Sequence, residues 1–298
     1  MLVEAPRLVR LPDGRSLALD DVGDPTGVPV VYLHGTPDSR LARHPDDAVT
    51  AASGVRLLAV DRPGAGLSDP HPDGTLGSLA QDVAHLLDEL GIERAALLGW
   101  SAGGLCALAV ASVLGERVLA VGLVSTVPPV EAYDDPDLVA ALGPARRTFV
   151  ELAAELAPAD LAAEMAPFLV PHPLTPELAL AHVLESAGER GRAELAAVPG
   201  AAERLAVALR EAMRGGESGL AHDLALQLER GIDLAAVTSP VRSFHGGEDG
   251  VSPPEVGAWV ATHVPHAVLD LVPDAGHHLI FPRWRGILRA VLRDARNP

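Results

Sequence analysis

The sequence predicts an α/β fold in which helices cover both faces of a mostly parallel sheet. Short apolar runs alternate with stretches of helical periodicity near both ends of the chain, which is the rhythm of strand–helix–strand units. Residues 128–230 lie between them; they are rich in alanine, leucine and glutamate, show no strand pattern and are interrupted by prolines. We therefore expect a core domain of residues 1–127 and 231–298, with residues 128–230 inserted as a helical lid over the strand ends where ligands bind in open α/β folds.

Composition excludes several classes of function. The 298 residues carry a formal charge of −17, which argues against a nucleic-acid partner. All 23 basic residues are arginine, so Schiff-base lysines and phosphate-binding P-loop lysines are ruled out. No apolar run approaches the ~18 residues of a membrane span, and residues 1–14 lack the apolar core of a secretory signal. We expect a soluble, cytoplasmic protein without a membrane partner, and Cys106, the single cysteine, cannot form an internal disulfide.

The first strands are indicated by alternation and by β-branched residues. Residues 8–11 and 16–20 alternate around the Pro-Asp-Gly turn at 12–14 and predict an antiparallel hairpin. The apolar run at 30–33 is typical of a strand covered on both faces, and it ends in the loop 34–37.

The alternation then continues towards the centre of the chain. A helical stretch to about Ser53 should lead into the strand 55–60, which runs into the loop 61–68. Apolar residues recur at helical spacing from Ser78, and Gly91 ends that helix. After the insertion the pattern resumes, and it predicts a strand at 240–244, a helix at 254–263, a strand at 267–271 and a final helix at 284–295.

The pentapeptide Gly99-Trp100-Ser101-Ala102-Gly103 follows the predicted strand 95–98 and precedes an apolar helical run. In that context G-x-S-x-G reads as a nucleophile elbow, a sharp strand-to-helix turn with a serine held in a strained conformation at its apex. Glycines at both ends would avoid collisions between side chains, and the helix N-terminus would stabilise negative charge beside the serine. The alternative is an ordinary strand-to-helix turn with a small polar residue.

Five motifs together resemble the α/β-hydrolase family over nearly the whole chain. They are His34-Gly35-Thr36-Pro37 after the third strand, Asp61-Arg62-Pro63-Gly64-Ala65-Gly66-Leu67-Ser68 after the fourth, the elbow, Gly246-Gly247-Glu248-Asp249, and Gly276-His277-His278. The order of nucleophile, acid and histidine also fits this fold.

The resemblance implies a catalytic triad. A serine hydroxyl needs a neighbouring base to accept its proton, and histidine suits that task at neutral pH. Ser101 would be the nucleophile, His277 the base and Asp249 the carboxylate that orients the base. His278 is the alternative base and Glu248 the alternative acid, since each is adjacent to its preferred counterpart.

The same resemblance assigns the supporting groups. The backbone N–H groups of Thr36 and Ala102 would form the oxyanion hole, and His34 would hold that loop by hydrogen bonding. Trp100 either touches the pocket or packs behind the nucleophile. No dinucleotide, cofactor or metal site is expected, because Gly64-x-Gly66 lacks the third glycine of a fingerprint and H-E-x-x-H is missing.

These residues predict a serine hydrolase of the carboxylesterase kind, acting on a small-molecule ester of a small or medium acid. A C–C bond hydrolase, a lactonase, a thioesterase and a cofactor-free haloperoxidase-like enzyme are alternatives on the same triad. A ligand-binding protein of the same fold is the alternative from another class. In the insertion, Phe149, Met165, Phe168 and Leu169 would line a substrate pocket or form the core of the lid.

Overall fold

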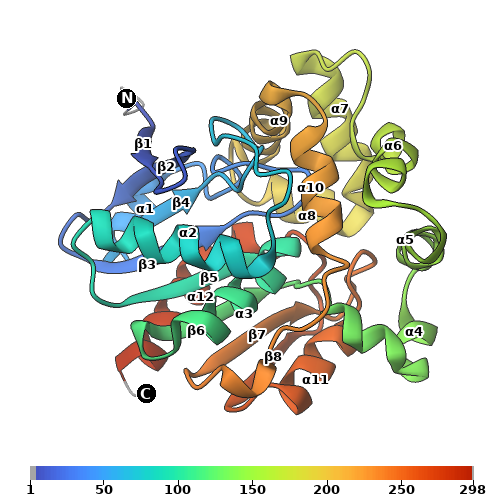
Figure 1. Ribbon diagram of the computed structural model, residues 1–298. Helices are drawn as coiled ribbons and strands as arrows, with labels where there is room; N and C mark the ends of the chain where they lie inside the picture. Colours follow the sequence, from blue (N-terminus) through green and yellow to red (C-terminus); the bar gives the residue numbers. More distant parts are fainter. Residues whose placement is uncertain (1–4, 297–298) are drawn as a thin grey trace.

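The computed structural model describes residues 5–296 and builds them around an eight-stranded sheet (Figure 1). The strands are β1 (Arg7–Arg10), β2 (Ser16–Gly23), β3 (Val28–Leu33), β4 (Val55–Val60), β5 (Ala95–Trp100), β6 (Val118–Val124), β7 (Val241–Gly246) and β8 (Ala267–Val272). Their spatial order is β1-β2-β4-β3-β5-β6-β7-β8, with β1 and β2 antiparallel to their neighbours and every pairing from β4 onwards parallel. The predicted α/β architecture is confirmed.

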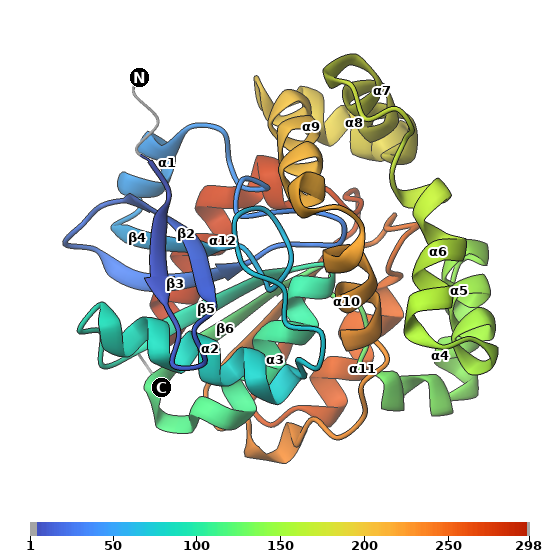
Figure 2. The same ribbon diagram turned by 45° about the horizontal axis from the view of Figure 1, so that its top comes forward.

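The α-helices fall into two groups by their place in the chain. Those that flank the sheet are α1 (Asp47–Ala51), α2 (Leu76–Glu89), α3 (Ala102–Leu114), α11 (Pro254–His263) and α12 (Ile280–Arg296). Those between β6 and β7 are α4 (Pro136–Ala141), α5 (Pro144–Glu155), α6 (Pro158–Leu169), α7 (Pro176–Ser186), α8 (Gly188–Ala196), α9 (Ala201–Ala212) and α10 (Ser218–Leu226). No strand of residues 5–296 falls among this second group, which gathers along one side of the sheet (Figures 1 and 2).

Side chains alternate across the sheet and give it two apolar faces. In β3, Tyr32 belongs to the cluster that contains the apolar residues of α12, whereas Leu33 belongs to the cluster of α2 and α3. Both residues have no exposed surface. Successive residues of a strand point to opposite faces, so a strand buried on both sides must be apolar throughout, as β3, β5 and β6 are. β4 departs from this pattern at one residue, Arg56, which pairs with Asp21 at 2.6 Å.

Most predicted elements are present, and one is much shorter than expected. The predicted antiparallel hairpin is present, with Arg10 opposite Ser16. The helical stretch predicted to reach Ser53 is wrong, because only Asp47–Ala51 is helical. Much of the preceding segment is loop fixed by buried ion pairs: the guanidinium of Arg40 lies 2.6 Å from the Asp61 carboxylate and 3.0 Å from that of Asp20. These tertiary contacts override local helix propensity.

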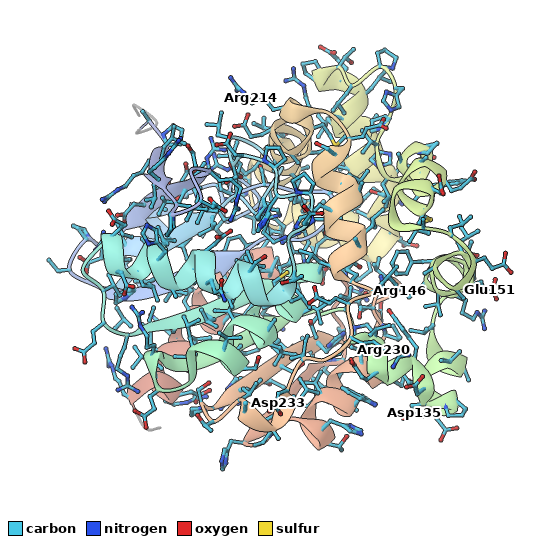
Figure 3. All side chains as sticks on the ribbon, viewed as in Figure 1. Asp135, Arg146, Glu151, Arg214, Arg230 and Asp233 are labelled. Atoms are coloured by element: carbon cyan, nitrogen blue, oxygen red, sulfur yellow. The ribbon has the colours of Figure 1, made fainter. Side chains whose placement is uncertain are left out.

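Polar contacts attach the segments between β6 and β7 to one another. Arg146 on α5 donates to the Tyr133 hydroxyl at 2.7 Å and to Gln227, just past α10, at 2.9 Å. Figure 3 labels Arg146 on the side of α5 that faces α10, whereas Glu151 of the same helix points outwards.

Within residues 5–296, no helix combines the length and apolar character that crossing a bilayer requires.

Candidate active site

The turn between β5 and α3 has the geometry of a strained elbow. Ser101 has φ 54° and ψ −124°, a region that residues with side chains rarely occupy. A Cβ on Gly99 would lie 2.2 Å from the Gly103 carbonyl oxygen, and one on Gly103 would lie 2.0 Å from that of Leu33. Both glycines are therefore required by backbone that cannot move aside, and the second by the end of β3 rather than by the elbow itself.

His277 and Asp249 are brought together from loops after neighbouring strands. The Nδ1 atom of His277 lies 3.0 Å and 3.1 Å from the two Asp249 carboxylate oxygens. The N–H groups of Val251 and Ser252 donate to the same carboxylate at 2.9 Å each. With Nδ1 engaged, the Nε2 atom at the opposite side of the imidazole is left to exchange protons with a substrate or nucleophile.

The electrostatics of Asp249 favour its ionised form. Its burial, with 5% of its surface exposed, opposes ionisation, but His277 and the Ser252 amide outweigh burial and hold the pKa of Asp249 below its usual value. Glu248 instead points to solvent and pairs with Arg190 at 2.6 Å. Of the two adjacent carboxylates, only Asp249 contacts His277.

His278 has different surroundings from its neighbour. Its Nδ1 atom is buried and has no hydrogen-bond partner among the described residues, and burial lowers the pKa of His278 to about 3.

Trp100 takes both of the roles that the sequence left open. Its Nε1–H donates to the His277 carbonyl at 3.0 Å, and its ring also borders the cavity beside Ser101. Trp100 therefore both packs against the histidine loop and lines the pocket.

Ser101 and His277 border one cavity of about 330 Å³. Within residues 5–296 the Ser101 hydroxyl makes no hydrogen bond, an open arrangement that is common where catalytic contacts tighten only with substrate bound. The wall comes from the loops after β3, β5, β7 and β8 and from α6, α7 and α9. The lining residues are Gly35, Thr36, Pro37, Asp38, Trp100, Ser101, Phe168, Leu169, His182, Val183, Ser186, Leu205, Leu209, Val251, His277 and His278.

The insertion residues singled out from the sequence divide between cavity and core. Phe168 and Leu169 line the cavity, and Phe168 is 75% exposed. Phe149 is buried under the guanidinium of Arg146. It belongs to the apolar cluster that also contains Tyr32, and Met165 packs against this cluster. Asp38, which also lines the cavity, has no hydrogen-bond partner in the described chain, and burial raises the pKa of its carboxyl to about 8.

The backbone amides of Thr36 and Ala102, which lie beside Ser101, have no acceptor within the described chain. Ala102 is the first residue of α3, where the amide has no intrahelical partner. Gly35 places the Thr36 loop against the elbow, since a Cβ on Gly35 would lie 3.3 Å from the Ser101 Cβ.

Arg62 sets the direction of the Thr36 amide, a role that the sequence did not reveal. Its guanidinium donates to the carbonyl oxygens of His34 and Gly35, the latter at 3.1 Å. In a trans peptide the N–H points opposite to the C=O, so the Thr36 N–H points away from Arg62. Asp223 on α10 anchors this arginine, with their charged atoms 2.6 Å apart.

His34 supports the same loop, as expected. Its Nδ1 donates to the Gly35 carbonyl at 2.8 Å, and its Nε2 accepts from the Arg62 amide at 3.2 Å. Burial, together with the nearby Arg62 charge, lowers the pKa of His34 to about 3, which keeps the ring neutral. Gly64 and Gly66, in the loop that carries Arg62, both have positive φ, at 81° and 55°.

A second supporting residue that the sequence did not reveal is Glu194 on α8. Its carboxylate accepts hydrogen bonds from the backbone on both sides of His277.

Within residues 5–296, no three His, Cys, Asp or Glu side chains are arranged to hold a metal ion.

Known proteins resemble this chain along most of its length. A family model described as alpha/beta hydrolase fold matches residues 28–283. The dihydrolipoyllysine-residue acetyltransferase component of the acetoin cleaving system of Pseudomonas putida is 29% identical over 268 residues, which are 89% of this chain and 62% of that protein. In two further curated relatives the match spans only 38% and 45% of their length.

Solved structures show the same fold. A bromoperoxidase from Bacillus anthracis superposes with a TM-score of 0.70 at 22% identity, covering 98% of this chain and all of the other. An esterase from Rhodococcus sp. superposes with a TM-score of 0.67 at 23% identity, covering 98% of each chain. The acetyltransferase component, the bromoperoxidase and the esterase are named for different activities. The fold by itself therefore does not identify the bond that this chain acts on.

Proposed function

This chain belongs to the α/β-hydrolase fold family, and from that premise we propose that it hydrolyses carboxylic esters of small or medium acids through a Ser101–His277–Asp249 triad. The observation that carries the proposal is the His277–Asp249 contact of 3.0 Å beside a serine in a strained elbow on the same cavity. An ordinary strand-to-helix turn would require neither a serine in a strained conformation nor a His–Asp pair beside it.

The chemistry follows from these positions. The Ser101 oxygen attacks the ester carbonyl while His277 accepts its proton, and the amides of Thr36 and Ala102 stabilise the oxyanion that forms. His277 then protonates the departing alcohol, which leaves an acyl group on Ser101. A water molecule, deprotonated by His277, attacks that acyl group and releases the acid with the serine restored. Asp249 stabilises the imidazolium in both halves of the reaction.

The cavity argues for small substrates. About 330 Å³ is near the lower end of the volumes of small-molecule sites, and the walls include Leu169, Val183, Leu205 and Leu209. We further propose that α6, α7 and α9 act as a lid that forms the roof of this cavity, within a helical insertion of residues 128–230.

Two alternatives differ in how they are tested. A lactone, a thioester or a C–C bond would be cleaved by the same residues, so only substrates distinguish them. A ligand-binding protein would not need an activated serine at all. Covalent labelling with a fluorophosphonate separates this second alternative from all of the enzymes, because an activated serine is required for the adduct.

The first experiment measures hydrolysis of p-nitrophenyl esters from acetate to decanoate by the wild type and by Ser101→Ala. We expect turnover to be highest with the shorter acyl chains and the variant to lose at least about 10⁴-fold in kcat. Fluorophosphonate labelling of both proteins, read by intact mass, is the control. A folded wild type that forms no adduct and turns over no ester would overturn the proposal; an adduct without ester turnover would redirect it to lactones, thioesters or C–C substrates.

A further inference from the structure

Helix α8 lies against the two loops that bring the acid and the histidine together. Glu194 lies three positions after Gly191 and four after Arg190, the spacings that bring residues to one side of a helix. Gly191 lets the His278 ring approach, since a Cβ at that position would lie 2.7 Å from the His278 Nδ1 atom. Arg190 covers the start of the histidine loop, where a Cβ on Gly276 would lie 2.8 Å from the Arg190 Cγ. The face is therefore shaped to the loop.

Glu194 binds that loop on both sides of His277. One carboxylate oxygen accepts the Gly276 N–H at 2.6 Å, and the other accepts the His278 N–H at 3.0 Å. Only 7% of the Glu194 surface is exposed, so water does not compete well for these bonds. Hydrogen bonds to a carboxylate are shorter and stronger than those between neutral groups. The backbone on either side of the base is thus fixed by one side chain, 82 residues away in the chain.

We propose that Glu194 is a positioning residue for His277, through which the inserted helices hold the catalytic base in its working orientation. The inference rests on the proposed function of Ser101, His277 and Asp249. It adds that the lid and the triad are joined by a buried contact, so that a displacement of α8 also displaces the base.

The charges around Glu194 give the proposal a signature that a purely structural contact lacks. The groups that face it are Asp249, His277, Arg190 and the amides of Gly276 and His278. Burial raises the pKa of Glu194, and the two amides oppose that shift. His277 acts in the same direction as the amides and lowers the pKa of Glu194, so the two side chains interact electrostatically.

The other polar contact made by this face of α8 is much weaker. Arg190 pairs with Glu248 at 2.6 Å, but the two side chains are 40% and 48% exposed. Exposed ion pairs contribute little to stability or rigidity. The buried carboxylate of Glu194 is therefore the contact to test.

Three variants test it: Glu194→Gln, Glu194→Asp and Glu189→Gln. Glutamine keeps the size but removes the charge and replaces one acceptor oxygen with an amide NH2, so one loop amide loses its partner. Aspartate keeps the charge with a shorter reach. Glu189 is exposed on the same helix, so its change to glutamine removes the same charge without touching the loop.

For Glu194→Gln we expect kcat to fall roughly 10- to 100-fold with KM changed no more than about threefold, the loss typical of a small misplacement of a reacting group. The acid limb of the kcat/KM profile should move to lower pH, because the protonated base loses a nearby negative charge. Glu194→Asp should keep the acid limb of the wild type and recover part of kcat. Glu189→Gln should match the wild type in both.

Amide hydrogen exchange at Gly276 and His278, followed by NMR, provides a readout that needs no substrate. We expect faster exchange in Glu194→Gln than in Glu189→Gln. Exchange at both amides, kcat and the acid limb all equal to the wild type, with only a lower Tm, would overturn the inference. If the wild type neither turns over ester nor takes a fluorophosphonate adduct, the proposed function fails, while exchange still decides whether Glu194 holds the loop.

Discussion

Asp249 and Glu248 show how surroundings assign different roles to neighbouring residues of the same charge. Asp249 is buried, accepts two backbone N–H groups and contacts His277, whereas Glu248 is 48% exposed and pairs with an arginine. A carboxylate that stabilises an imidazolium must be close to it and shielded from water, because water weakens the interaction. Only Asp249 meets both conditions.

Matched amide substitutions at these two positions test the assignment. We expect Asp249→Asn to lower kcat by roughly 10⁴-fold, because the neutral amide neither stabilises the imidazolium nor selects the required tautomer. Glu248→Gln should stay within about twofold of the wild type. The measurement is kcat with the best p-nitrophenyl ester, with circular dichroism to verify folding. Equal losses in the two variants would contradict the assignment of Asp249.

At the scale of the element, the elbow depends on glycines whose environments differ from those of other glycines in the chain. A Cβ on Gly103 would meet the carbonyl oxygens of Leu33 and His34 at 2.0 Å and 2.5 Å, and both belong to backbone that is fixed by the sheet and its loop. Gly286, in the middle of α12, has nothing within 4 Å of the same atom. The same substitution should therefore have opposite effects in the two elements.

We expect Gly103→Ala to destabilise the fold by about 3 kcal/mol and to abolish ester hydrolysis, because β3 and the elbow must separate to admit the methyl group. Gly286→Ala should stabilise the protein by roughly 0.5–1 kcal/mol, since alanine loses less backbone entropy in a helix. Thermal unfolding of both variants, together with ester turnover, measures the difference. A stabilised and active Gly103→Ala variant would show that the elbow is looser than its geometry indicates.

At the scale of the whole molecule, one buried ion pair connects the helices between β6 and β7 to the loop of residues 34–37. Arg62 follows β4, Asp223 belongs to α10, and their side chains are 1% and 4% exposed. The pair also reaches Thr36, whose hydroxyl donates to Asp223 at 3.1 Å. Arg230, which is labelled in Figure 3, forms a comparable link with Asp134 near the surface, at 3.2 Å, with 59% and 70% exposure.

Removing the acid from each pair should give very different results. Asp223→Ala leaves a buried, unpaired guanidinium, which costs roughly 3–5 kcal/mol, so we expect Tm to fall by about 10 °C. Ester turnover, measured at temperatures below the new Tm, should also decrease, because the Thr36 loop loses its anchor. Asp134→Ala should change stability by less than about 1 kcal/mol. A similar small shift in Tm for both variants would argue against a structural role for the buried pair.

The sequence by itself determined the features that depend on neighbours along the chain. Apolar runs located β3, β4, β5, β7 and β8, because a buried strand and a half-buried helix have different periods. The glycines around Ser101 predicted its strained turn, which is a local steric problem. The motifs also marked the loops that meet at the cavity, because parallel strands bring their carboxyl ends to one edge.

The tertiary structure alone decided which distant side chains meet. Glu194 contacts residues 82 and 84 positions away, and Arg62 meets an aspartate 161 positions away. It also separated Asp249 from Glu248 and limited the helix before β4 to five residues, because Arg40 is bound to buried carboxylates. Such contacts leave no periodic trace, since the packing of whole elements, rather than any local pattern, sets which buried charges find partners.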